Sequence, residues 1–150
     1  MRMLLSLPLA VSLCAFAAAP VQAQSYRQIL QAQIDAVDGS LRDRGYRPDP
    51  GAFPSDFIAG FLEEGASVGL ELTLQAGQAY VVVGVCDADC SDLDLAVLDD
   101  SGNVLVEDEL TDDVPVLEFN GPPSGVAMLL VTMYDCSVEP CGFAYKVYRR

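Results

Sequence analysis

The stretch CDADCSDLDLAVLDD, residues 86–100, contains the side chains best suited to chemistry: six carboxylates and two cysteines in fifteen residues. Hard cations such as Ca²⁺ bind several oxygen ligands, and carboxylates this close together repel one another unless a cation relieves them. A calcium site at a strand edge is therefore one interpretation of the stretch. Four aspartates are its candidate ligands: Asp87, Asp89, Asp92 and Asp94.

An EF-hand loop is excluded. A loop starting at Asp87 would have Asp92 where Gly is required at position 6, and Leu98 where Glu is required at position 12. A second interpretation needs no ion. Asp87 and Asp89 would form side-chain-to-backbone turns, while Asp92 and Asp94 would face water. The sequence favours this second interpretation, with the calcium site as the alternative.

The absence of histidine from the sequence limits the catalytic possibilities. Ser-His-Asp and Cys-His sites cannot be built, and zinc hydrolase chemistry based on histidine is excluded. A pair of carboxylates could still serve glycoside hydrolysis. However, the Asp and Glu residues fall mostly in turns and at alternating outward positions, which is typical of a solvated acidic surface. We therefore expect a protein without catalytic activity, with a small carboxylate-based hydrolase as the less favoured alternative.

The N-terminus has the pattern of a secretory signal peptide. A positive start at Arg2 precedes the apolar run 4–19, and Val21-Gln22-Ala23 offers small residues for cleavage before Gln24. The run is short for a membrane span, which needs about 20 apolar residues. We expect residues 1–23 to be removed, and the product to be periplasmic or secreted with no membrane span. The alternatives are an uncleaved anchor and a lipoprotein modified at Cys14.

An even number of cysteines in an exported chain indicates disulfides. Four remain after residue 23, and each of two close pairs brackets polar, turn-forming residues. We favour the pairs Cys86–Cys90 and Cys136–Cys141. A cross-link between the two loops is the rival pairing, and a four-cysteine zinc site is the functional alternative.

The charge of the chain restricts its partners. Eight Lys and Arg stand against 22 Asp and Glu, giving a net charge of −14, and no basic residue occurs between Arg47 and Lys146. Such a surface repels nucleic acid and anionic lipid. It would attract a cation or an unknown basic protein, although the charge could equally serve solubility alone.

Periodicity divides the chain into a helix, a linker and a β domain. Residues 24–44 are predicted to be helical, because Leu30, Ile34, Val37 and Leu41 recur at helical spacing. This stripe favours docking on the domain over binding a partner. Residues 45–57 contain three prolines and two glycines, which predicts a linker without regular structure.

Residues 58–150 change to a period of two. Runs of alternating or β-forming residues are separated by turns rich in Gly, Asn, Asp and Pro, which predicts an antiparallel β-sandwich. On one strand Leu93, Leu95 and Val97 should share the core face. The run 126–134 is nearly all apolar, which predicts a central strand buried on both faces. About seven strands are expected: 68–74, 79–85, 93–97, 104–107, 114–119, 126–134 and 143–148.

One family resemblance covers roughly residues 60–148. The strand Asp92–Asp99, the turn Ser101–Leu105, the strand Pro115–Phe119 and Gly125 before an apolar strand together resemble the bacterial pre-peptidase C-terminal (PPC) domain. Its members are small exported β-sandwich or jelly-roll modules without catalytic activity, often appended to secreted proteases. Some related collagen-binding modules bind calcium and matrix polymers. The aromatic residue usual after the Gly is missing here, where Val126–Met128 stands, and the cysteine pairs are additions.

The sequence thus predicts a mainly β protein, an antiparallel β-sandwich or jelly-roll-like domain preceded by one N-terminal helix. The expected function is that of an exported, non-catalytic binding or accessory module with an acidic face. No cofactor is required, and Ca²⁺ is the candidate ion; the candidate partner is an unknown basic protein or an extracellular polymer. The alternative is a structural or stress-related envelope protein without a ligand.

Overall fold

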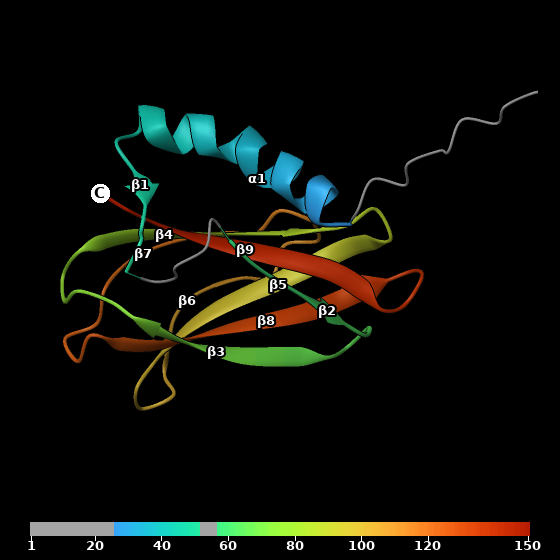
Figure 1. The fold of residues 1–150 in the computed structure, drawn as a ribbon. Helices are drawn as coiled ribbons and strands as arrows, with labels where there is room; N and C mark the ends of the chain where they lie inside the picture. The colour runs from blue at the N-terminus through green and yellow to red at the C-terminus, as the bar shows by residue number, and fades with distance from the viewer. Residues whose placement is uncertain (1–25, 52–56) are drawn as a thin grey trace, which may run out of the picture.

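The computed structural model describes residues 26–51 and 57–150 (Figure 1). In these residues one helix is followed by nine strands. The elements are α1 (Tyr26–Asp43), β1 (Arg47–Pro48), β2 (Ile58–Leu62), β3 (Ser67–Thr73), β4 (Ala79–Cys86), β5 (Cys90–Asp99), β6 (Val104–Asp108), β7 (Val116–Asn120), β8 (Val126–Cys136) and β9 (Cys141–Arg149). The predicted signal peptide lies outside the described residues.

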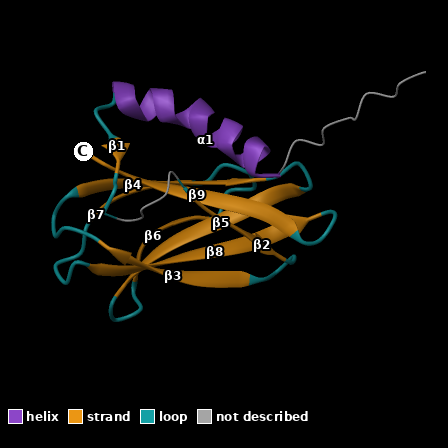
Figure 2. Cartoon of the chain, in the orientation of Figure 1, coloured by secondary structure: helices purple, strands orange, loops and turns teal. Residues whose placement is uncertain are grey.

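The strands form two antiparallel sheets, which confirms the predicted fold class. In the five-stranded sheet the order is β1-β9-β4-β7, with β2 also paired to β9. In the four-stranded sheet the order is β3-β8-β5-β6. Helix α1 lies against the five-stranded sheet, and the four-stranded sheet lies on the far side of the sandwich (Figure 2).

The main core lies between the two sheets. Leu93, Leu95 and Val97 of β5 are buried in it, as the alternating pattern predicted. Facing strands contribute further buried side chains from both sheets: Leu72, Tyr80, Val82, Leu117, Leu129, Val131, Phe143, Tyr145 and Val147. Burial of apolar surface on this scale is the principal stabilising term of such a sandwich.

A second core lies between α1 and the outer face of the five-stranded sheet. Leu30, Ile34 and Leu41 of the helix are buried there, which confirms that the predicted stripe docks on the domain. The sheet contributes outward-facing residues of β4 and β9: Val81, Val83, Val85, Ala144 and Tyr148. Because both faces of β4 are covered, this strand is buried along nearly its whole length.

Two expectations about elements were wrong. Residues 45–57 are not free of regular structure, because Arg47 and Pro48 form β1 and pair with Arg149 and Tyr148 of β9. The strand 126–134 is not buried on both faces. It is central in its sheet, but no described helix covers its outer side, and Met128 is 47% exposed.

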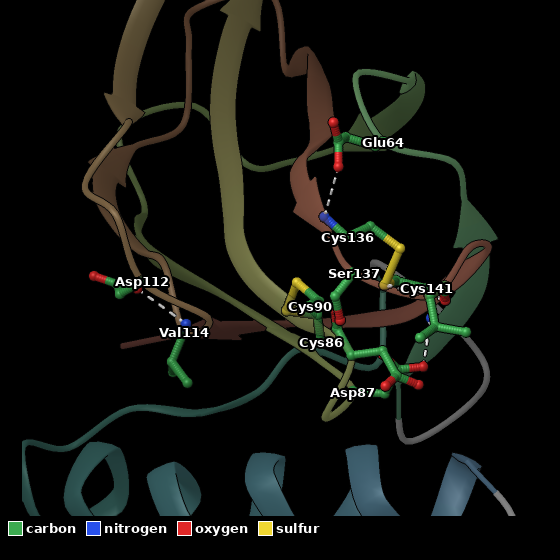
Figure 3. The surroundings of a disulfide bond; sticks show 12 residues. Glu64, Cys86, Asp87, Cys90, Asp112, Val114, Cys136, Ser137 and Cys141 are labelled. Carbon is green, nitrogen blue, oxygen red and sulfur yellow. Dashed lines mark hydrogen bonds between the residues drawn. A yellow bond between two sulfur atoms is a disulfide. The ribbon is translucent and has the colours of Figure 1, made fainter.

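Both predicted disulfides are present. Cys86 and Cys90 are joined across the β4–β5 turn, and Cys136 and Cys141 across the β8–β9 turn. The two disulfides lie at the same end of the sandwich (Figure 3), where Cys90 and Cys136 are paired between β5 and β8. Disulfides are typical of proteins in oxidising, exported compartments. In the described part of the chain no helix is both long and apolar enough to cross a membrane.

Candidate cation-binding site

The structure separates the four aspartates of the predicted calcium site into two pairs. Asp87 and Asp89 lie in the β4–β5 turn, while Asp92 and Asp94 lie on β5. Asp87 Oδ2 accepts a hydrogen bond of 2.7 Å from the backbone N–H of Gly142 (Figure 3). This side-chain-to-backbone hydrogen bond therefore links the turn to β9.

Asp89 serves the same turn through its backbone. Its carbonyl oxygen accepts hydrogen bonds from the N–H and the hydroxyl of Ser137, both at 2.8 Å. Its side chain is exposed. The predicted local turns formed by the Asp87 and Asp89 side chains are therefore not the contacts observed: Asp87 reaches across to β9, and Asp89 contacts Ser137 through its backbone carbonyl.

Asp92 does not face water. The whole residue is only 6% exposed. Its Oδ1 atom is buried and has no hydrogen-bond partner among the described residues. Alternation along β5 is interrupted here, because the pairing with β8 shifts between Cys90 and Asp92 and again between Asp92 and Leu93. As a result Asp92 and Leu93 are both buried, which a regular strand with one solvated face would not allow.

Asp92 lines a hollow of about 270 Å³ on the surface of the four-stranded sheet. Asp94 lines it from the same strand, Glu109 and Thr111 from the β6–β7 connection, and Tyr134 from β8. Neither Asp87 nor Asp89 borders the hollow. The structure therefore brings together half of the predicted ligand set and adds three side chains that carry oxygen.

Burial and like charges make this hollow unfavourable for bare carboxylates. The pKa of Asp92 is raised by burial first, and then by the neighbouring charges of Asp112 and Asp135. A hydrogen bond from the backbone of Asp112 offsets this only in part. The pKa of Asp94 is raised by burial and by three acidic neighbours, of which Asp92 has the largest effect and Glu109 the next.

Two neighbouring carboxylates outside the hollow accept hydrogen bonds from backbone N–H groups. Asp112 Oδ1 accepts a 3.0 Å hydrogen bond from the backbone N–H of Val114, within its own loop (Figure 3). Asp108 Oδ2 accepts a 3.0 Å bond from the N–H of Val116. These groups add negative potential to the hollow without lining it. No basic side chain lines it either.

The arrangement suits a hard cation that keeps part of its water. Within residues 26–51 and 57–150, no three His, Cys, Asp or Glu side chains are grouped so that they could enclose a metal ion as they stand. Asp92 and Asp94 supply carboxylate oxygens, and Thr111 and Tyr134 supply hydroxyl oxygens. Calcium accepts such mixed oxygen ligands together with water in a flexible geometry.

The sequence did not single out Glu109, because its place beside Asp94 depends on the register between two strands. Strands β5 and β6 form a hairpin in which Ala96 pairs with Glu107 and Leu95 with Asp108. Continuing this register places Glu109 beside Asp94. Proximity in sequence selected Asp87 and Asp89 as candidate ligands instead.

No family model matches this sequence, and no curated protein matches it at a significant level. The resemblance to the PPC domain therefore stays a prediction. The description of the site depends on its own geometry.

Proposed function

We propose that this protein is an exported, non-catalytic β-sandwich module that binds a divalent cation, Ca²⁺ in particular, in the hollow at Asp92 and Asp94. One observation carries the proposal. Asp92 Oδ1 is buried without a hydrogen-bond partner in the described structure, and acidic groups surround it. A buried carboxylate is costly unless it is paired or protonated, and a bound cation would pair it.

Other features support export and a binding role. Two disulfides and a predicted signal peptide at residues 1–23 agree with an oxidising compartment. The absence of histidine from the sequence removes the commonest acid–base catalyst. The PPC resemblance adds support, because some related collagen-binding modules bind calcium. A structural envelope protein without a ligand is the alternative function.

Thermal unfolding of the oxidised protein with Ca²⁺ and then with chelator tests the proposal. For a millimolar or somewhat tighter site, 10 mM Ca²⁺ should raise the Tm by roughly 5–10 °C, because a ligand that binds only the folded state stabilises it by mass action. Asp92→Asn with Asp94→Asn should abolish this rise. The same double variant should melt higher than the parent in chelator, because it removes two repelling charges.

The matched control is Asp89→Asn with Asp100→Asn, which removes two charges from exposed positions outside the hollow. It should keep the calcium-induced rise. A rise that survives in the Asp92 and Asp94 double variant would show that the site is elsewhere. No rise in the parent protein would favour the structural alternative.

A further inference from the structure

Within residues 26–51 and 57–150, no helix or further sheet covers the outer face of the four-stranded sheet, and this face is partly apolar. Helix α1 covers only the five-stranded sheet (Figure 1). On the opposite side of the sandwich β8 presents Val126, Met128 and Tyr134, which are 37%, 47% and 65% exposed. Large apolar side chains gathered on one face often mark a binding surface.

One end of this face is hollowed into a groove of about 430 Å³, which we call the β5–β8 groove. Its apolar lining comes from Leu98 of β5 and from Val126 and Met128 of β8. Its polar lining comes from Glu71 on β3, from Asp99 at the end of β5 and from residues 100–102 of the β5–β6 turn. Asp92 and Asp94 do not line it, so this groove is distinct from the cation hollow.

Met128 gives the groove an adaptable floor. Its side chain lies over Gly69 of β3, where an added Cβ would come within 2.9 Å of Met128 Sδ. The missing side chain at Gly69 therefore makes room for the thioether. Methionine is flexible and polarisable, and it is common at surfaces that fit differing apolar side chains.

The charges around the groove have one sign. Glu71, Asp99 and Asp100 line it, and no basic side chain does. The pKa of Asp99 is lowered by hydrogen bonds from Asn103 and from its own turn, so this carboxylate stays ionised. No Lys or Arg occurs in any strand of the four-stranded sheet.

The basic residues lie on the other side of the molecule. The seven in the described structure belong to α1, to the segment after it, and to β9 with the C-terminal residue: Arg27, Arg42, Arg44, Arg47, Lys146, Arg149 and Arg150. Four of them form ion pairs there with Asp38, Asp49 or Glu118. The acidic rim of the groove therefore has no internal cation to neutralise it.

We propose that the β5–β8 groove binds a segment of a partner protein in which an apolar side chain is flanked by Lys or Arg. The apolar side chain would contact Leu98 and Met128, and the flanking cations would meet Glu71 and Asp100. Charge complementarity requires a partner segment with positive charge. Burial of the apolar side chain then favours those basic segments that carry one. The proposal is independent of the cation hollow.

Fluorescence anisotropy with labelled synthetic peptides tests this in chelator, at near-physiological salt. The probe is the peptide Lys-Lys-Leu-Lys-Leu-Lys-Lys. The control peptide has Ser in place of both Leu residues. We expect the Leu peptide to bind about tenfold more tightly than the Ser peptide. Met128→Ser should remove most of this difference. Glu71→Gln with Asp100→Asn should weaken both peptides.

The matched control is Val116→Ser, which removes a side chain of similar exposure, 40%, from β7 in the other sheet. It should leave both affinities unchanged. Equal binding of the two peptides would overturn the proposal, as would equal effects of Met128→Ser and Val116→Ser. The Asp92→Asn, Asp94→Asn variant should bind the Leu peptide as the parent does, and loss of binding there would place the peptide in the cation hollow instead.

Discussion

Asp87 shows how a single carboxylate can join a turn to a strand. Its Oδ2 accepts the N–H of Gly142 at 2.7 Å, and its own N–H donates to the carbonyl of Gly142 at 2.9 Å. Asp87→Ala would leave the first N–H without a partner, which should lower the free energy of unfolding by about 1–3 kcal/mol in urea titrations. Asp87→Asn keeps an acceptor oxygen and should recover most of the loss.

The exposed neighbour Asp89 provides the comparison for this prediction. Asp89→Ala removes a solvent-exposed carboxylate while the backbone contacts to Ser137 remain. Its effect should stay within about 0.5 kcal/mol. If Asp87→Ala were equally mild, the Asp87–Gly142 contact would contribute little to holding the β4–β5 turn against β9.

At the scale of elements, α1 depends on a few apolar contacts for its place on the sheet. Ile34 is completely buried against the five-stranded sheet, with Leu30 one helical turn before it. Ile34→Ala should lower the free energy of unfolding by about 2–5 kcal/mol, measured in urea, because it leaves a cavity in this second core. The exposed substitution Asp35→Ala should cost a few tenths of a kcal/mol. Equal costs would mean that α1 is undocked in solution.

The same helix explains where sequence patterns predicted strands well and where they did not. Alternation in β5 identified its core face, because Leu93, Leu95 and Val97 meet the other sheet. Continuous apolarity in 126–134 suggested burial on both faces, but burial on the outer face requires a covering element. Periodicity describes one strand and does not say which sheet the helix covers. Helix α1 covers β4 and β9, whereas the outer side of β8 stays open in the described structure.

The cation hollow was predictable only in part for a related reason. Proximity in sequence selected Asp92 and Asp94 correctly as neighbours, since they are two residues apart on one strand. It could not reveal the register shifts that bury Asp92. Nor could it place Tyr134 of β8 beside them, because this contact depends on long-range pairing between strands.

At the scale of the whole molecule, charge is divided between the two sides of the sandwich. The side that carries α1 holds the basic residues and the ion pairs, and the four-stranded sheet carries acidic residues alone among its charged residues. On the helix side, Asp38 lies 3.4 Å from Lys146 and also pairs with Arg42. Opposite charges are thus used to hold the helix, while like charges accumulate on the face proposed to bind ligands.

This division gives the stability a pH dependence with two opposite limbs. Burial and acidic neighbours raise the pKa of Asp92 and Asp94, so their destabilising effect is complete above the raised pKa values and declines as the pH falls toward the ordinary carboxyl range. The pKa of Asp38 is lowered, because Arg42 and Lys146 outweigh the effect of burial. Hydrogen bonds, first from Tyr46 and then from Arg44, lower the pKa of Glu118.

Asp38 and Glu118, whose pKa values are lowered, stabilise the fold above the ordinary carboxyl pKa. This stabilisation is lost as the pH falls through their lowered pKa values. In chelator, the Tm should therefore rise as the pH is lowered from about 7 toward the ordinary carboxyl range, and it should fall again as the pH drops below that range. The Asp92→Asn, Asp94→Asn variant should lose much of the rise, because the groups that gain protons are gone. The Asp89→Asn, Asp100→Asn variant should keep it. A Tm that declines steadily from pH 7 in the parent protein would mean that the two β5 carboxylates are not held as unfavourable charges, and the main argument for a cation in the hollow would be removed.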